Sequence, residues 1–132
     1  MKQISVARGI AIKVNDQGDT ISMNVDDQRF IDKFYGLIET FDKSTAVIRG
    51  KQNAGEREKL KNLISETEKI MAGIDDIFGK DACKKIFGDI VPSPVLIADF
   101  FDQMIPITRN YTNERQKMIE QKYSRSRKGG RR

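Results

Sequence analysis

The chain has 132 residues, 38% of them apolar and 33% charged, a balance typical of one soluble, helix-rich domain rather than of a disordered protein. It contains no histidine, which removes the commonest general base and metal ligand, and its single cysteine, Cys83, cannot form an internal disulfide. The net charge of +5 is uneven: residues 109–132 hold nine Lys or Arg and two Glu, or +7, whereas the other 108 residues hold 15 basic and 17 acidic side chains, or −2. No apolar stretch approaches the ~20 residues of a membrane span, and the N-terminus lacks the apolar core of a secretion signal.

The first 25 residues carry a strand pattern. Apolar residues alternate with mostly small or polar ones in two runs, Ile4, Val6, Ile10, Ile12 and Val14, then Ile21, Met23 and Val25. Period-two alternation is typical of half-buried strands. Residues 15–19 between the runs are turn formers, so the sequence predicts a β-hairpin within residues 1–25. A two-stranded hairpin is marginal alone, and we expect it to lie on helices or to pair with another copy.

An amphipathic helix is predicted near residues 27–43. Asp26 and Asp27 can cap its first turn. Its apolar residues recur at spacings of one, three and four, as Phe30, Ile31, Phe34, Leu37, Ile38 and Phe41. The pattern fades near Lys43 and Ser44, and residues 50–55 form a polar break.

A second long helix is predicted over residues 54–78. Its apolar residues keep heptad spacing for three heptads, which is the lower limit for a coiled coil. An ordinary core helix of a bundle is the favoured interpretation of this spacing. Gly73 costs roughly 1 kcal/mol relative to alanine inside a helix and indicates a bend.

The most informative stretch begins at Ile77 and contains two similar segments, residues 77–81 (Ile-Phe-Gly-Lys-Asp) and 86–89 (Ile-Phe-Gly-Asp). In each, a glycine after an apolar pair can adopt the left-handed conformation that closes a helix. The aspartate that follows can cap the next helix. These segments predict a helical corner with a short helix over residues 81–87, in which Gly79 and Gly88 have an architectural role.

The remaining helices are predicted over residues 94–105 and 107–125. Ser93 followed by Pro94 is a typical helix start, and Pro106 ends or kinks the first of the two helices. The overall prediction is therefore a mainly α (α+β) fold with about five helices. A single domain covers residues 1–123 with its hairpin in residues 1–25, and residues 124–132 form a basic flexible tail.

Residues with catalytic potential do not form a recognisable site in the sequence. Cys83 has no partner for a triad, and its apolar setting favours an inert core thiol. The Gly73 to Lys80 segment fails as a phosphate loop, because five residues separate its glycines and Asp81 replaces the required Ser or Thr. Asp75 and Asp76 point about 100° apart on a helix and are better interpreted as a cap and a solvated side chain. We therefore expect no enzyme activity, no cofactor and no metal.

The basic C-terminal segment has two interpretations. Its charged side chains are Lys122, Arg125, Arg127, Lys128, Arg131 and Arg132. Clustered basic residues can bind phosphates of a nucleic acid through counterion release. A solubilising or partner-docking terminus is favoured, because Tyr123 is the only residue there that could stack on a base.

The helical corner also resembles a known family. Residues 75–89 (Asp-Asp-Ile-Phe-Gly-Lys-Asp-Ala-Cys-Lys-Lys-Ile-Phe-Gly-Asp) and 100–106 (Phe-Phe-Asp-Gln-Met-Ile-Pro) resemble the small tail assembly chaperones of long-tailed phages and prophages of Gram-positive bacteria. Members often show an aspartate and an apolar pair before Phe-Gly, a Lys-rich turn into a second Phe-Gly-Asp, and a helix with a basic end. The hairpin and the first helix are compatible with this family, although only residues 75–106 are distinctive.

The resemblance implies a non-enzymatic protein of the host bacterial cytoplasm that is absent from the mature virion. Such proteins bind the tape measure protein and keep it soluble while tail tube protein polymerises around it. The family offers no active-site residues to transfer, so the choice of a client-binding surface depends on physical arguments. That surface is predicted at Phe100, Phe101 and Met104, with Phe78 and Phe87 as scaffold. The alternative that all five lie in the core stays open, because large apolar residues are usually buried.

Two classes of function follow from the sequence. The first is an assembly chaperone that forms homo-oligomers and offers an apolar surface to a helical client. The second is a small nucleic-acid-associated phage or bacterial protein that binds phosphates through its basic tail. Salt separates them, because tail-driven DNA binding weakens steeply between ~50 and ~200 mM salt and apolar binding hardly changes. The chaperone is favoured, and no membrane partner is expected.

Overall fold

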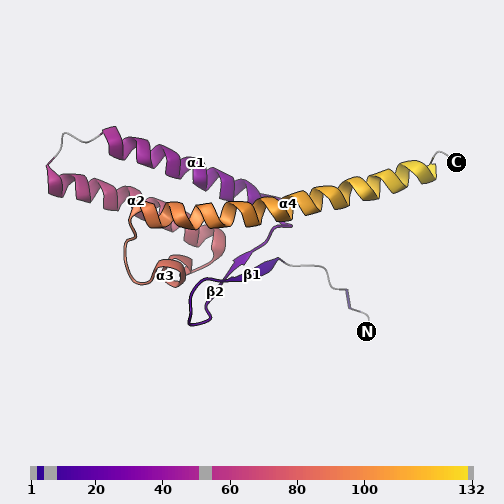
Figure 1. Ribbon diagram of the computed structural model, residues 1–132, viewed down its shortest axis with the longest axis horizontal. Helices are drawn as coiled ribbons and strands as arrows, with labels where there is room; N and C mark the ends of the chain where they lie inside the picture. The colour runs from indigo at the N-terminus through magenta and orange to yellow at the C-terminus, as the bar shows by residue number, and fades with distance from the viewer. Residues whose placement is uncertain (1–2, 5–8, 51–54, 131–132) are drawn as a thin grey trace.

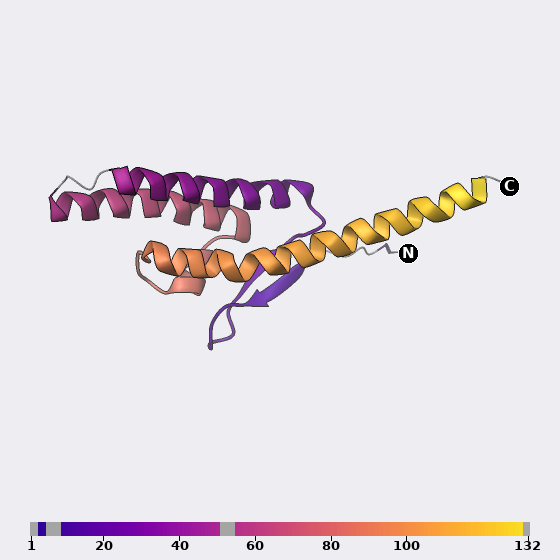
Figure 2. The same ribbon diagram turned by 45° about the horizontal axis from the view of Figure 1, so that its top comes forward.

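A computed structural model describes residues 3–4, 9–50 and 55–130, with side chains described as far as Lys122. In chain order its elements are β1 (Ile10–Lys13), β2 (Thr20–Met23), α1 (Gln28–Gly50), α2 (Glu56–Phe78), α3 (Ala82–Phe87) and α4 (Pro94–Gly130). Helices α1 and α2 lie antiparallel, and α4 runs along this pair (Figures 1 and 2). Helix α3 and strand β2 pack against α2 beside α4, and the second half of α4 extends beyond the rest of the protein (Figure 2). The predicted mainly helical fold with an N-terminal hairpin is confirmed.

The hairpin is antiparallel, with Ile10 opposite Met23 and Ile12 opposite Ile21. Its turn is organised by Asn15, whose Oδ1 accepts hydrogen bonds from the backbone N–H groups of Gln17 (2.9 Å) and Asp19 (3.2 Å). The strands are shorter than the predicted apolar runs. Ile4 is 87% exposed, and Val6 falls outside the described residues.

Helix α1 begins as predicted but continues seven residues past Lys43. Asp27 caps it, because its Oδ1 accepts a hydrogen bond from the Arg29 N–H at 2.9 Å. The predicted end near Ser44 is wrong, since the Ser44 side chain is buried and donates from Oγ to Glu66 Oε2 of α2 at 2.8 Å. This hydrogen bond lets a polar residue occupy an apolar stripe, so the helix stays packed on α2 to its C-terminal turns.

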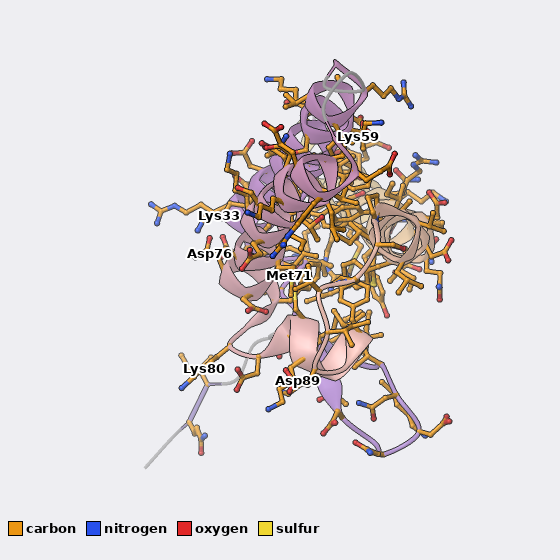
Figure 3. All side chains as sticks on the ribbon, turned by 90° about the vertical axis from the view of Figure 1, so that its left-hand side faces the viewer. Lys33, Lys59, Met71, Asp76, Lys80 and Asp89 are labelled. Carbon is orange, nitrogen blue, oxygen red and sulfur yellow. The ribbon has the colours of Figure 1, made fainter. Side chains whose placement is uncertain are left out.

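Helix α2 is a core helix that packs in the protein's own interior. Thr67, Ile70, Ile74 and Phe78 are its buried residues. On its outer flank, Lys33 of α1 and Asp76 face each other, with 3.6 Å between Nζ and Oδ2 (Figure 3). Gly73 marks a close contact between α1 and α2, because a Cβ added there would lie 2.5 Å from Leu37 Cδ1.

In the helical corner, Gly79 and Gly88 close their helices as predicted, but the residue that caps α3 is not the predicted one. Gly79 and Gly88 both have positive φ angles, of 115° and 86°, and close α2 and α3 with N–H bonds to the carbonyls four residues before. The prediction that Asp81 caps α3 through its side chain is wrong. Asp75 takes that role, since its Oδ1 accepts a hydrogen bond from the Cys83 N–H at 2.9 Å. Asp89 caps no helix either, because it lies in the loop after α3 and α4 begins only at Pro94 (Figure 3).

Helix α4 is continuous through Pro106, so the described part of the chain has four helices rather than about five. Proline removes one backbone hydrogen bond, but Thr108, two residues later, is fully buried and its Oγ1 donates to the Met104 carbonyl at 2.9 Å. Burial of residues on both sides of Pro106, such as Met104 and Thr108, therefore keeps α4 one continuous helix. The backbone remains helical to Gly130, and the predicted flexibility of residues 124–132 stays a prediction about their behaviour in solution.

Aromatic rings join the helices in the core. Phe78 of α2 packs edge-to-face on Phe30 of α1 and on Phe100 of α4, with both ring centroids at 5.5 Å. Phe34 of α1 contacts Phe101 of α4 at 6.4 Å. Each well-oriented aromatic pair adds about 0.5–1.5 kcal/mol beyond area burial, so these contacts fix α4 against the helix pair.

Replacing Gly73 by valine tests the contact between α1 and α2. On helix propensity alone, Gly73→Val should stabilise the protein and Ala72→Val, at an exposed position one residue away, should destabilise it. Because the new side chain must displace Leu37, we expect Gly73→Val instead to lower the free energy of unfolding by about 1–3 kcal/mol. Urea unfolding of both variants measures this, and a Gly73→Val protein more stable than the parent would contradict the close contact.

Candidate functional site

The predicted client-binding residues lie mostly inside the protein. Phe78, Phe101 and Met104 are each 3% exposed and Phe100 is 7% exposed, whereas Phe87 is half-buried. As single side chains, these residues offer little surface to a partner. The prediction that Phe100, Phe101 and Met104 form an open surface is therefore wrong for this structure, because their rings and thioether fill the space between α4 and the helix pair.

Three of these residues nevertheless meet at the wall of one groove. Phe87 of α3 packs on Phe100 of α4 with 6.0 Å between ring centroids. A cavity of about 340 Å³ opens beside them, between β1 and its following turn, α3 and α4. Its lining residues are Ile12, Lys13, Val14, Ile86, Phe87, Leu96, Asp99, Phe100, Gln103, Met104 and Ile107. We call this cavity the apolar groove, since eight of the eleven residues are apolar.

The apolar groove includes residues that the sequence did not single out as a site. Ile12 and Val14 come from the hairpin, and Leu96, which is 42% exposed, comes from the first turn of α4. The strand alternation identified Ile12 and Val14 as facing an interior, but nothing in it indicated which helix they would meet. The three polar residues Lys13, Asp99 and Gln103 complete the lining.

The hairpin is fixed to α3 by hydrogen bonds at the edge of this region. Asn15 Nδ2 donates to the Lys85 carbonyl at 3.0 Å and to Asp19 Oδ2 at 2.8 Å. Lys85 Nζ in turn donates to the Thr20 carbonyl at 3.4 Å. Two walls of the apolar groove, β1 and α3, are thus held together by polar contacts that the apolar residues alone would not supply.

Two other hollows have different chemistry. One of about 800 Å³ lies at the tip of the α1–α2 pair, where Ile48, Leu60 and Leu63 alternate with charged side chains. The other, of about 690 Å³, lies between the hairpin turn and α3 and is lined mainly by polar residues such as Asp16, Asp81 and Lys84. Neither contains any of the residues of the Phe-Phe segment 100–106.

Reactive groups are few in the part of the chain that the structure describes. Cys83 is buried, and burial followed by the nearby Asp75 carboxylate raises the pKa of its thiol to about 12. The thiol is therefore protonated at neutral pH, as expected for an inert core cysteine. Among the described residues, no three acidic or cysteine side chains gather closely enough to hold a metal ion.

The basic residues of the C-terminal segment that the structure describes lie on the projecting half of α4. Arg115 is bound to Asp26, which precedes α1, with 3.3 Å between Nη2 and Oδ2, while Lys117 and Lys122 are exposed. Arg125, Arg127 and Lys128 belong to the last turns of α4. Arg131 and Arg132 lie outside the described residues.

Comparison with known proteins gives a family without an assigned role. A family model described as "Family of unknown function (DUF6673)" matches residues 17–132. The chain belongs to this family. The DUF6673 match includes β2 and all four helices of the described structure, and therefore both α-helical walls of the apolar groove. No curated protein and no solved structure matches the chain.

Within the described residues, none of the helices combines the length and the apolar character needed to cross a lipid bilayer.

The ion pair between Asp26 and Arg115 makes stability depend on pH. The hydrogen bond from Arg115 and its positive charge hold the pKa of Asp26 below its ordinary value. Because this folded-state pKa is depressed, the stabilisation is present above the ordinary pKa of an aspartate, about 3.9, and disappears as pH falls through the folded-state value.

We therefore expect Asp26→Asn to destabilise the protein at pH 7 and to make little difference near pH 2. The pair is largely exposed, so the effect at pH 7 should be small and should shrink at high salt. Urea midpoints of parent and variant at both pH values measure it, with Asp42→Asn on α1 as a control. A deficit that persists unchanged at low pH would show that the carboxylate charge is not its cause.

Proposed function

We propose that this chain is a phage tail assembly chaperone-like protein, which binds the tape measure protein without enzymatic chemistry and assists tail tube polymerisation. The proposal implies a protein that acts in the host bacterial cytoplasm and is left out of the mature virion. Its first support is the resemblance of residues 75–106. In the fold, this distinctive segment comprises the end of α2, all of α3 and about the first third of α4.

The observation that carries the proposal is the apolar groove. Its walls come from three elements, two of which belong to the distinctive segment, and Phe87, Phe100 and Met104 contribute to its lining. An apolar groove of this kind can receive the apolar face of an amphipathic helix through side chains spaced by three and four residues. A long helical client that would otherwise aggregate exposes such faces.

The composition of the apolar groove suits a reversible complex. Burying one Leu- or Ile-sized client side chain gains about 1.5–3 kcal/mol, from which the entropy lost on association is subtracted. A groove of about 340 Å³ admits only a few such side chains. A single copy would therefore bind one client segment weakly, and tail tube subunits could displace it during polymerisation.

Leu96→Asp tests the apolar groove. Co-expression with the tape measure protein of the same gene cluster should keep that client soluble when the parent chain is present. Leu96 is 42% exposed, so an aspartate there should be compatible with folding while it places a charge in the apolar contact, at a cost of about 2 kcal/mol or more. We expect at least a tenfold loss of client recovered in the soluble complex.

The matched control is Leu60→Asp on α2, where a leucine of similar exposure (53%) lies outside the apolar groove. This variant should retain the complex. Failure of the parent chain to solubilise the client, or equal losses for both variants, would contradict the proposed site.

The nucleic-acid alternative gives a different result in the same experiments. DNA binding through the basic C-terminal segment should weaken steeply between about 50 and 200 mM salt, because counterions are released on binding. Tight DNA binding at low salt that is abolished by deleting residues 122–132 would favour that function over the chaperone.

A further inference from the structure

Helix α4 divides into an acidic and a basic half. Within α4, residues 94–108 contain two aspartates and no Lys or Arg, or a charge of −2, whereas residues 109–130 hold seven Lys or Arg and two Glu, or +5. The sequence alone showed the basic end of this division. The fold adds that both halves belong to one uninterrupted helix, Pro94–Gly130, with its acidic half on the body of the protein (Figure 1).

Exposed apolar side chains accompany the negative charges. Val95 is 68% exposed, and Asp99 and Asp102 follow it at spacings of four and three, which places the three on one side of α4. The loop before α4 also exposes Asp89, Ile90 (52%) and Val91 (46%). We call Val95, Asp99 and Asp102, which share one side of α4, the acidic face. An exposed apolar side chain beside carboxylates is a candidate for contact with a complementary surface.

Exposed apolar side chains also accompany the positive charges. Met118 is 51% exposed and Ile119 is 47% exposed, about one turn after Arg115, the residue of α4 that binds Asp26 and whose Nη1 lies 3.9 Å from Met118 Sδ. Lys117 and Lys122 flank them and are exposed, and with the exposed Glu120 the residues 117–122 carry a net charge of +1. We call Lys117, Met118, Ile119 and Lys122 the basic end.

The acidic face and the basic end cannot meet within one molecule. Val95 and Met118 are separated by 23 residues of continuous helix, or about 35 Å at 1.5 Å per residue. Each surface has exposed apolar side chains in the described structure, Val95 on the acidic face and Met118 and Ile119 on the basic end, and the two surfaces have net charges of opposite sign. A second copy of the chain supplies both complements at once, which an anionic polymer bound only to the basic end would not.

We propose that the basic end of one copy docks on the acidic face of another copy. Met118 and Ile119 pack against Val95 and its neighbours, while Lys117 and Lys122 approach the aspartates. Because the two surfaces are different, the contact is heterologous and leaves one free surface at each end of a pair. Further copies can then add in the same direction. The inference does not depend on the identity of the client.

Two variants block one surface each in the full chain. Val95→Lys/Asp102→Lys introduces positive charge on the acidic face, and Met118→Gln/Ile119→Gln removes the apolar residues of the basic end while keeping good helix formers. Asp42→Lys/Val47→Lys repeats the first pair of changes at exposed positions of α1, where Val47 is 43% exposed. All three should keep the helical circular dichroism of the parent.

Sedimentation over a dilution series measures the assembly. We expect the parent and the α1 control to form species heavier than the 15.1 kDa monomer, more so at low salt. Each blocked variant should associate at least tenfold more weakly. An equimolar mixture of the two blocked variants should restore a species of roughly twice 15.1 kDa, since one intact pair of surfaces remains.

Three results would overturn the proposal. The parent chain could stay monomeric at every concentration, either blocked variant could assemble like the parent, or the mixture could remain monomeric although both variants are folded. A monomeric parent whose basic end binds duplex DNA would assign that end to nucleic acid instead.

Discussion

The edge-to-face packing of Phe78 is the contact on which the rest of the structure depends. Its ring lies 5.5 Å from Phe30 of α1 and 5.5 Å from Phe100 of α4, so one side chain joins three helices. It is also the last residue of α2, directly before Gly79 turns the chain into α3. The position of α3, and with it one wall of the apolar groove, therefore follows from where this ring is buried.

The corner after Phe78 sets the orientation of α3 and so places one wall of the apolar groove at the surface. Gly79 closes α2, and Asp75, one turn earlier, caps α3 by accepting the Cys83 N–H. Helix α3 has six residues and would not be stable alone, so its orientation depends on this cap and on the contact of Phe87 with Phe100. The burial of Phe100 and the partial exposure of Phe87 are two sides of the same contact. Core and candidate binding surface are thus built from neighbouring aromatic residues.

The sequence predicted what depends on local spacing and missed what depends on distant partners. The stripe of Phe30, Phe34 and Leu37 predicted the first part of α1 correctly, and the glycines of the corner predicted the ends of α2 and α3, because each signal lies within a few residues. Ser44 was misjudged because its partner, Glu66, is 22 residues away. The predicted break into two helices at Pro106 is wrong because burial of the surrounding turns outweighs one lost backbone hydrogen bond. The apolar groove was missed for a similar reason: β1 meets α4 over more than 80 residues of chain.

The continuity of α4 gives the proposed functions a common physical basis. One face of its first half closes the apolar groove through Leu96, Phe100 and Met104, Val95 and Asp102 lie on the acidic face, and Asp99 belongs to both. Its second half carries the basic end away from the body (Figure 1). Had Pro106 ended the helix, the basic end could have folded back onto the acidic face of its own chain. A single long helix excludes that intramolecular contact and leaves each surface to another molecule. Copies joined through α4 would present their apolar grooves repeatedly, which suits a long helical client better than one weak site does.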